Sequence, residues 1–351
     1  MESGTVEQAL PGLEGSDLTT TGTVVGRAIG LAPSKRLMLV SGRSNPDLAH
    51  EIAHRIGCEL GEVTLKTFAS GETYCRYEDS IRGADIFIVQ TASMPVDQHL
   101  MELLIMINAA KLASAKRITA VVPWYFYVRQ DKKSRPREPI TAKLVADLLQ
   151  TAGADRVLTM DLHAGQVQGF FEIPVDHMTA IPLFAKYVRD LNLDEGLAVV
   201  SPDTGHAKIA GKFAEMVAGD LVILNKVRPE HNQAKVTTVI GDVEGKVAVI
   251  IDDIIDTAGT LVAGAKALRD AGATKVYACA THGLFNGQAL ELIATSQIHK
   301  LVVTDTVPLD PLRQPENVQV LSIASILAET ILNVFSDDSV SALFAGENQL
   351  F

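Results

Sequence analysis

The sequence predicts an α/β fold in two halves, each built on a mainly parallel sheet. From Leu37 onward, short runs rich in β-branched residues alternate with stretches of helical periodicity, a pattern typical of parallel strands joined by helices. A faint internal repeat supports two copies of one module. "DIFIVQ", a helix and "ASAKRITAVVP" in the first half parallel "KVAVIID", a helix and "AGATKVYACATHG" in the second. The alternative is that all strand–helix–strand units look alike.

The elements follow one another along the chain in this alternating order. Residues 1–35 are rich in Gly, Thr, Ser and acid without periodicity, which predicts a flexible tail. We expect helices between the strands, for example over 97–112 and 260–271. Strands are expected at "RLMLVSG", "DIFIVQT", "RITAVVP", "RVLTMDL", "LAVVSPD", "DLVILNK", "VAVIID", "KVYACAT" and "KLVVTDT". The predicted domains span 36–180 and 181–335, followed by a C-terminal tail over 336–351.

Composition limits the class of protein. A chain of 351 residues that is 47% hydrophobic is long enough for two globular cores. The net charge of −11 makes nucleic acid an unexpected partner. Because no apolar run approaches membrane length and no secretory pattern opens the chain, we expect a cytoplasmic protein without a membrane partner. Cys58, Cys75 and Cys279 have neither metal-ligand spacing nor an even count, so we expect packed thiols.

The segment "VAVIIDDIIDTAGTL" places three carboxylates after an apolar run. We expect the strand to end at Asp252, which places Asp252, Asp253 and Asp256 at the sheet edge where α/β proteins bind ligands. Thr257 and Thr260 add hydroxyl groups, and the following helix N-terminus favours an anion. A phosphorylated sugar combines an anion with hydroxyls that donate to carboxylates. A helix cap is the alternative, but it would explain only Asp256.

Two further pairs of residues carry charge or ligand atoms. Lys226 and Arg228 in "NKVRPEHNQAK" are two residues apart, a spacing that points both side chains to one face of a strand. A solvated basic turn is the alternative. His163 and Asp203 each follow an apolar strand, and an imidazole with a carboxylate suits magnesium that arrives with nucleotide phosphates. A lone histidine in this position is otherwise a hydrogen-bonded structural residue.

Two further motifs do not indicate a function by themselves. "YVRQDKKSRPREP" holds five basic residues between Arg129 and Arg137, which fits a solvated loop or a nucleic-acid patch. "FASGE" at 68–72 fits an ordinary turn. The sequence has no G-x-x-x-x-G-K-[ST] loop and no G-x-G-x-x-G after the first strand, which argues against a P-loop kinase and a dinucleotide enzyme.

Taken in order, these motifs resemble one family. The acidic segment resembles the phosphoribosyl-diphosphate (PRPP) loop of type I phosphoribosyltransferases and PRPP synthetases. With "FASGE", "YVRQDKK", "EPITAKLVADLL", "RVLTMDLHAGQVQGFF", "VVSPDTG" and "NKVRP", the chain from Leu37 to Phe344 resembles the ribose-phosphate pyrophosphokinase family. The resemblance implies two tandem phosphoribosyltransferase-like domains of type I. It also implies transfer of the diphosphoryl group of ATP to the 1-hydroxyl of ribose 5-phosphate, which gives PRPP and AMP.

The resemblance also assigns roles to matching residues. It implies Mg²⁺ as cofactor and a homo-oligomer, hexameric in the family, in which the segment after Asp131 responds to regulatory anions. The implied catalytic residues are Lys226 and Arg228, and the implied metal ligands are His163 and Asp203. The implied ATP-binding residues are Phe68, Ser70, Gly71, Glu72, Arg129, Gln130 and Asp131. The implied ribose 5-phosphate residues are Arg228, Asp252, Asp253, Asp256, Thr257, Ala258, Gly259 and Thr260.

A few residues depart from the family pattern. Ser70 stands where an acid or amide is common, which leaves the choice of nucleoside triphosphate open. Ala258 replaces a frequent Gly and would be strained at positive φ. His206 stands where Gly or Arg is common, and Phe126 where a smaller residue is usual. Two rival functions stay open: a non-catalytic paralogue that regulates an active partner, and a phosphoribosyltransferase that consumes PRPP.

Overall fold

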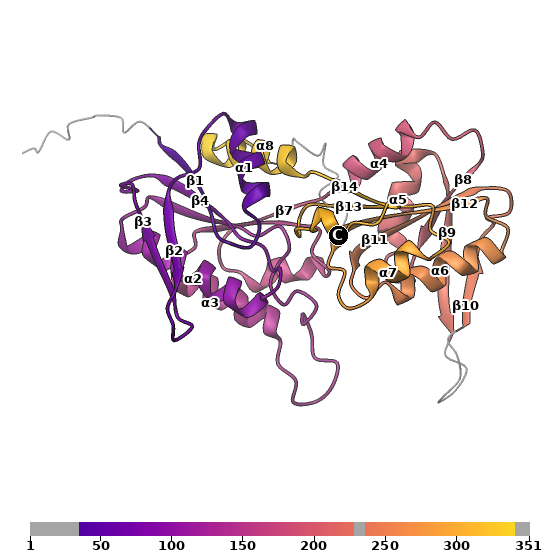
Figure 1. Cartoon of the computed structure of the whole chain (residues 1–351), viewed down its shortest axis with the longest axis horizontal. Coiled ribbons are helices and arrows are strands. Elements are labelled where there is room, and N and C mark those ends of the chain that lie inside the picture. Colours follow the sequence, from indigo (N-terminus) through magenta and orange to yellow (C-terminus); the bar gives the residue numbers. More distant parts are fainter. Residues whose placement is uncertain (1–34, 228–235, 341–351) are drawn as a thin grey trace, which may run out of the picture. The chain divides into compact units, whose positions relative to one another are not determined.

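The chain folds around two mainly parallel sheets and one small hairpin, which confirms the predicted fold class (Figure 1). The structure is a computed structural model that describes residues 35–227 and 236–340. The described residues belong to one compact unit that begins at Lys35. The predicted limits of the two domains and of the tails stay a prediction.

The first sheet is entirely parallel, with the strand order β1-β4-β5-β6-β7. Its central strands are buried, and every residue of β4 is buried, as expected for a parallel sheet covered on both faces. The hairpin β2–β3 is separate from this sheet and antiparallel. The bounds are β1 (Leu37–Ser41), β2 (Val63–Thr67), β3 (Thr73–Tyr77), β4 (Asp85–Val89), β5 (Arg117–Val121), β6 (Arg156–Met160) and β7 (Val175–Met178).

The second sheet has the order β10-β9-β8-β11-β12-β13-β14. All its strands are parallel except β10, which pairs antiparallel with β9. The bounds are β8 (Leu197–Ser201), β9 (Asp220–Val227), β10 (Val236–Ile240), β11 (Val247–Ile255), β12 (Lys275–Gly283), β13 (Lys300–Thr304) and β14 (Val318–Leu321).

Helices connect the parallel strands, and the N-terminus of α1 is capped by a side chain, whereas those of α2 to α8 are not. In α1, the Asn45 side chain accepts from the Leu48 N–H, Pro46 opens the first turn, and Gly57 ends the helix at φ 80°. The bounds are α1 (Pro46–Ile56), α2 (Val96–Leu112), α3 (Thr141–Ala152), α4 (Ile181–Asp190), α5 (Ala207–Val217), α6 (Gly259–Asp270), α7 (Ala289–Ala294) and α8 (Ala324–Ser336), with 3₁₀ turns η1 (Gly165–Phe170) and η2 (Pro311–Arg313). No described helix is long and apolar enough to cross a membrane.

The two halves share apolar packing. One cluster of buried residues contains Leu39 and Phe87 from the first sheet together with Val199 and Val249 from the second. Helix α8 follows the last strand of the second sheet and lies beside α1 of the first half (Figure 1). This shared core fixes the carboxyl ends of the two sets of strands relative to each other, which is the condition for a site made from both.

Strand β11 runs further than the sequence predicts. It pairs with β12 from Val247 to Ile255 but with β8 only as far as Ile250. The expectation that the strand ends at Asp252 is therefore wrong, because β12 continues beside it and supplies the backbone hydrogen bonds. Asp252 and Asp253 therefore lie inside β11, in the part of the strand that pairs with β12 but no longer with β8. The edge that β8 leaves open is where the site described next is formed.

Candidate active site

Asp253 lies between two imidazoles that come from different parts of the chain. Its Oδ2 is 2.7 Å from Nδ1 of His163, which follows β6 of the first sheet. Its Oδ1 is 3.3 Å from Nε2 of His206, which precedes α5 in the second half. The carboxyl ends of β6, β8 and β11 therefore converge on one carboxylate, the position at which α/β proteins bind ligands.

His206 also links the two other acids of this cluster. Its Nδ1 is 3.4 Å from Oδ1 of Asp203, and its Nε2 is 3.9 Å from Oδ1 of Asp252. Asp203 Oδ1 is held in place by the backbone N–H groups of Gly205 and His206, at 2.8 and 3.1 Å. The loop after β8 is thus a rigid support that aims one imidazole at the acidic strand.

Burial and charge make this cluster electrostatically unusual. Hydrogen bonding to Asp253 is the largest effect that raises the pKa of His206, to about 9, and it also raises the pKa of His163. Burial alone would raise the pKa of Asp253, but the two imidazoles hold it well below its usual range. Burial and the neighbouring charge of Asp253 raise the pKa of Asp252. Such a concentration of shifted groups is typical of functional sites.

A second contact joins the halves at Asp256. Its Oδ2 is 2.5 Å from Nη1 of Arg129, and its Oδ1 accepts from Nδ2 of Asn286 at 2.7 Å. Burial would raise the pKa of Asp256, but Asn286 and Arg129 together lower it. Asp256 is therefore held as a carboxylate at the start of the loop that leads into α6.

The loop before α6 contains one residue in a left-handed conformation. Ala258 has φ 61° and precedes the helix without any side-chain cap. The strain considered from sequence is therefore present at Ala258, because an L-residue other than Gly is disfavoured at this φ. A Cβ added at Gly259 would meet nothing within 4 Å, so this glycine borders open space. The first turn of α6 therefore leaves room for a bound group at its N-terminus.

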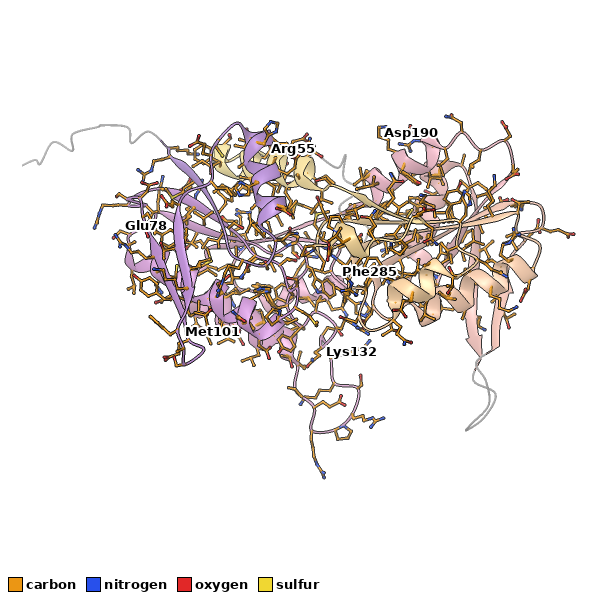
Figure 2. All side chains as sticks on the ribbon, viewed as in Figure 1. Arg55, Glu78, Met101, Lys132, Asp190 and Phe285 are labelled. Carbon is orange, nitrogen blue, oxygen red and sulfur yellow. The ribbon has the colours of Figure 1, made fainter. Side chains whose placement is uncertain are left out.

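Two adjoining cavities open around these residues. One of about 240 Å³ is lined by Arg129, His163, Asp203, His206, residues 252–258, Thr260 and Leu261. Another of about 830 Å³ is lined by Arg129, Asp131, Lys132, Ser134, His163, residues 164–166, Gln168, Asp203, Gly205, His206, Lys208 and Ile209. Lys132 reaches it from the loop between β5 and α3 (Figure 2). Because both cavities share Arg129, His163, Asp203 and His206, they are two parts of one site.

Comparison with known proteins identifies the family. Residues 37–153 match the N-terminal domain of ribose phosphate pyrophosphokinase, and residues 199–345 match the phosphoribosyl synthetase-associated domain. A ribose-phosphate pyrophosphokinase of Staphylococcus saprophyticus is 50% identical over 310 residues, which cover 88% of this chain and 97% of that protein. One of Caldanaerobacter subterraneus subsp. tengcongensis is 51% identical over 308 residues, covering 88% and 98%.

The chain belongs to the ribose-phosphate pyrophosphokinase family. A solved structure agrees with this: the phosphoribosylpyrophosphate synthetase of Mycobacterium smegmatis has a TM-score of 0.83 at 44% identity, covering 86% of this chain and all of that one. The resemblance predicted from the motifs and the phosphoribosyltransferase-like fold are both confirmed.

The other residues that the family resemblance assigns to ATP are not all brought to this cluster. Gln130 Oε1 accepts from the Thr141 hydroxyl at 2.6 Å, so it faces the start of α3. Asp131 is buried and accepts from Gln166 at 3.3 Å. Gln130 also lines a third cavity, of about 690 Å³, next to Trp124.

The turn 68–72 joins β2 to β3 and is held by its own contacts. Ser70 Oγ donates to Glu72 Oε2 at 2.7 Å, and the Phe68 N–H donates to the Glu72 carbonyl at 2.9 Å. Gly71 has φ 90°, which this tight turn requires. Phe68 is 54% exposed and meets Tyr74 edge to face. None of the three cavities described above is lined by this turn.

The catalytic pair predicted from sequence is only partly described. The backbone of Lys226 lies in β9, paired with Thr237 of β10. Arg228 lies outside the described residues. Lys226 therefore lies in the strand expected at "DLVILNK", while the roles of Lys226 and Arg228 stay predictions.

Sequence reasoning missed three residues that the structure places in or beside the cluster. His206 was noted only as a departure from the family pattern, Asn286 was not considered, and Asp161 was overlooked beside His163. All three follow or end apolar strands, at β8, β12 and β6. That is the same signal that singled out His163 and Asp203, and applying it at every strand end would have found them.

Proposed function

We propose that the cleft around Asp253 is where the chain carries out its family's reaction, transfer of the diphosphoryl group of ATP to the 1-hydroxyl of ribose 5-phosphate. In that reaction the 1-hydroxyl oxygen attacks the β-phosphorus of ATP, its proton is lost, and AMP leaves. The observation that carries the proposal is the ion pair between Arg129 and Asp256, because it joins a residue expected to bind ATP to one expected to bind the sugar.

The loop after β11 supplies the proposed sugar site. Carboxylates of Asp252 and Asp256 can accept from sugar hydroxyls, while Thr257 and Thr260 line the same cavity and can donate to a phosphate. Backbone N–H groups at the start of α6 add to this, since a helix N-terminus favours an anion. Asp253, held by two imidazoles, lies between this loop and the larger cavity.

The larger cavity is the proposed place for the ATP phosphates. Arg129 and Lys132 line it and carry positive charge, which suits a polyphosphate. Phosphoryl-type transfer depends on positioning and on charge stabilisation rather than on covalent help from the protein. Lys226 and Arg228 are proposed to add further positive charge to the reacting phosphates.

We propose Mg²⁺ as the cofactor, with His163 and Asp203 as protein ligands. Both side chains are partly exposed and line the larger cavity, so each can reach an ion that arrives with nucleotide. The donor set fits, because Mg²⁺ is commonly bound through one or two protein groups together with water and substrate phosphates. When bound, the ion would neutralise charge on the transferring group.

Assembly and location are also proposals. Phe68 is exposed on a turn held by its own hydrogen bonds, and a base-stacking residue is of use only next to a nucleotide. A homo-oligomer, hexameric as expected for the family, would allow the turn of a second copy to approach the ATP cavity. We propose a cytoplasmic enzyme.

The test is formation of AMP and PRPP by the purified full-length chain with ATP, ribose 5-phosphate and Mg²⁺. Production of both in equal amounts is expected. A regulatory paralogue would bind both substrates without forming AMP. A phosphoribosyltransferase would form no AMP from these substrates and would consume added PRPP with a nucleobase.

A further inference from the structure

Three ligand atoms of the acidic cluster lie close enough to share one ion. Nε2 of His206 and one carboxylate oxygen each of Asp252 and Asp253 all lie within 4.8 Å of one another. Asp252 and Asp253 are consecutive in β11, and the Asp253 N–H donates to Asp252 Oδ1 at 2.9 Å, which turns the first carboxylate back over the strand. The three groups therefore form a compact set with mixed nitrogen and oxygen donors.

The His206 ring is oriented as a metal-ligating imidazole is. Its Nδ1 faces the Asp203 carboxylate at 3.4 Å, and its Nε2 faces Asp252 and Asp253. A carboxylate behind one ring nitrogen fixes the tautomer and directs the other nitrogen to the ion, an arrangement common around bound metals. A histidine that served only as a surface residue would not need acidic partners on both nitrogens.

A small cavity behind the cluster provides an independent observation. It is lined by Asp161, His206, Asp252, Asp253, Thr281 and three isoleucines, Ile181, Ile209 and Ile251. Asp161 is buried, and its Oδ2 accepts from the Thr281 hydroxyl and from the Ala180 N–H, at 2.6 and 2.8 Å. Its Oδ1 has no hydrogen-bond partner among the described residues, and burial raises the pKa of Asp161 although Thr281, Ala180 and Thr179 oppose this.

A buried carboxylate oxygen without a partner is costly, because it has lost its water without a replacement. A cation held by His206, Asp252 and Asp253 would border the small cavity that Asp161 also lines, and it would offset the concentration of negative charge there. An imidazole combined with two protein carboxylates suits Mn²⁺, Co²⁺ or Zn²⁺ better than Mg²⁺, which keeps most of its ligands as water and phosphate oxygens.

We propose that His206, Asp252 and Asp253 form a second divalent-cation site that selects ions with affinity for an imidazole nitrogen, such as Mn²⁺, Co²⁺ and Zn²⁺. This site differs from the Mg²⁺ position proposed at His163 and Asp203. The proposed selectivity depends on His206, because this ring supplies the nitrogen donor of the set.

The test uses Mn²⁺ as the probe on the full-length chain without substrates. Pulsed electron paramagnetic resonance detects coupling between Mn²⁺ and a coordinated imidazole nitrogen. We expect that coupling in the native chain and in His163→Ala, and its loss when His206→Gly is added to His163→Ala, because no imidazole ligand of either proposed site then remains. Titration with Co²⁺ should show an affinity lower by at least about tenfold in His206→Gly, as expected when a metal site loses an essential group. Mg²⁺ affinity should change by less than about threefold in His206→Gly, because the proposed Mg²⁺ ligands His163 and Asp203 are unchanged.

His50→Ala, at an exposed histidine, serves as the matched control and should bind Co²⁺ as the native chain does. His206→Gln is a second substitution that keeps a polar side chain, and in the His163→Ala background it should also lose the nitrogen coupling. Nitrogen coupling that survives either His206 substitution in that background, or equal Co²⁺ affinity in the native chain and the His206 variants, would overturn the proposal. Because these readouts need no turnover, they stay distinct from a failure to form AMP.

Discussion

Arg129 and Asp256, which are 127 residues apart in the chain, form an ion pair across the two halves of the site. Asn286 holds the other oxygen of Asp256, so the carboxylate is fixed while the guanidinium lies at the rim, 53% exposed. An exposed pair of this kind contributes little to stability. The ion pair matters for function, because a substrate that binds Arg129 or Asp256 must displace the other residue from it.

Replacement of Asp256 tests the sugar site. Asp256→Ala should weaken ribose 5-phosphate about ten- to a hundredfold, since loss of a charged hydrogen bond costs about 1.5–3 kcal/mol. ATP binding should survive, because Arg129 is released rather than removed. Calorimetric titration of each substrate measures both effects, and Asp270→Ala, on the exposed surface of α6, is the control. Equal weakening of ATP would show that Asp256 does not serve the sugar alone.

Ser70 should relax the choice of nucleotide. Its hydroxyl can donate or accept, so it distinguishes an amino group from a carbonyl less sharply than a carboxylate does. We expect measurable use of GTP or ITP by the native chain and reduced use by Ser70→Asp. Competing-substrate assays give the ratio of kcat/KM for ATP and GTP in each protein. A native chain strictly specific for ATP would mean that other groups read the base.

Lys226 and Arg228 should act on the transition state rather than on substrate binding. Charge that reaches the phosphates only when a loop closes stabilises the activated complex and leaves initial affinity unchanged. Lys226→Ala should lower kcat by several orders of magnitude with little change in ATP affinity. Arg228→Ala should behave similarly, with some loss of ribose 5-phosphate affinity. The double variant should show less than the sum of the two effects if both residues contact one diphosphoryl group.

Steady-state kinetics with calorimetric ATP binding separates these outcomes. Variants that fail to bind ATP and yet turn over normally at saturation would make this segment a binding element, and the transition-state role would be wrong.

Acid should destabilise the fold through His177. Burial, with a smaller effect of His282, lowers the pKa of His177 from 6.5 to about 4, and its Nε2 accepts from the Leu162 N–H at 2.8 Å. Because the folded pKa lies below the unfolded one, stability is intact above pH 6.5 and falls as the pH drops toward 4. Between pH 7.5 and 5 the contribution of His177 to this loss should be about 2 kcal/mol.

Urea unfolding at the two pH values measures this loss in the native chain and in His177→Asn. The variant should be less stable at pH 7.5 but should lose about 2 kcal/mol less on acidification. His54→Asn, at an exposed histidine, should follow the native chain. Identical losses in all three proteins would assign the acid sensitivity to other groups.

Much of the architecture could be predicted because parallel strands produce long apolar runs. The strands at β4, β5 and β6 lie where "DIFIVQT", "RITAVVP" and "RVLTMDL" indicate. Short or less apolar strands were not predicted: β7 and β14 have four residues each, β10 contains two threonines, and the β2–β3 hairpin has partly exposed, polar residues. Their pairing is set by neighbours distant in sequence, which a local pattern does not contain.

At the site, too, some features could be predicted from the sequence and others could not. The placement of Asp252, Asp253 and Asp256 at the site could be predicted from charge that follows an apolar run in the sequence. The reach of β11 to Ile255 could not, because it depends on β12 continuing beside it to Gly283. The same holds for His206, whose role depends on Asp253 almost fifty residues away in sequence. Such contacts are products of the tertiary fold.

Replacement of Asp253 tests most directly whether the cleft between the two halves is the reaction centre. Asp253→Asn keeps the size of the side chain but removes the charge that holds His163 and His206. AMP formation from ATP and ribose 5-phosphate with Mg²⁺ should fall by at least about a hundredfold, since electrostatic preorganisation is usually the largest catalytic contribution. Asp270→Asn should retain native turnover, and circular dichroism should show both variants folded. A folded Asp253→Asn protein that forms AMP at the native rate would contradict the account.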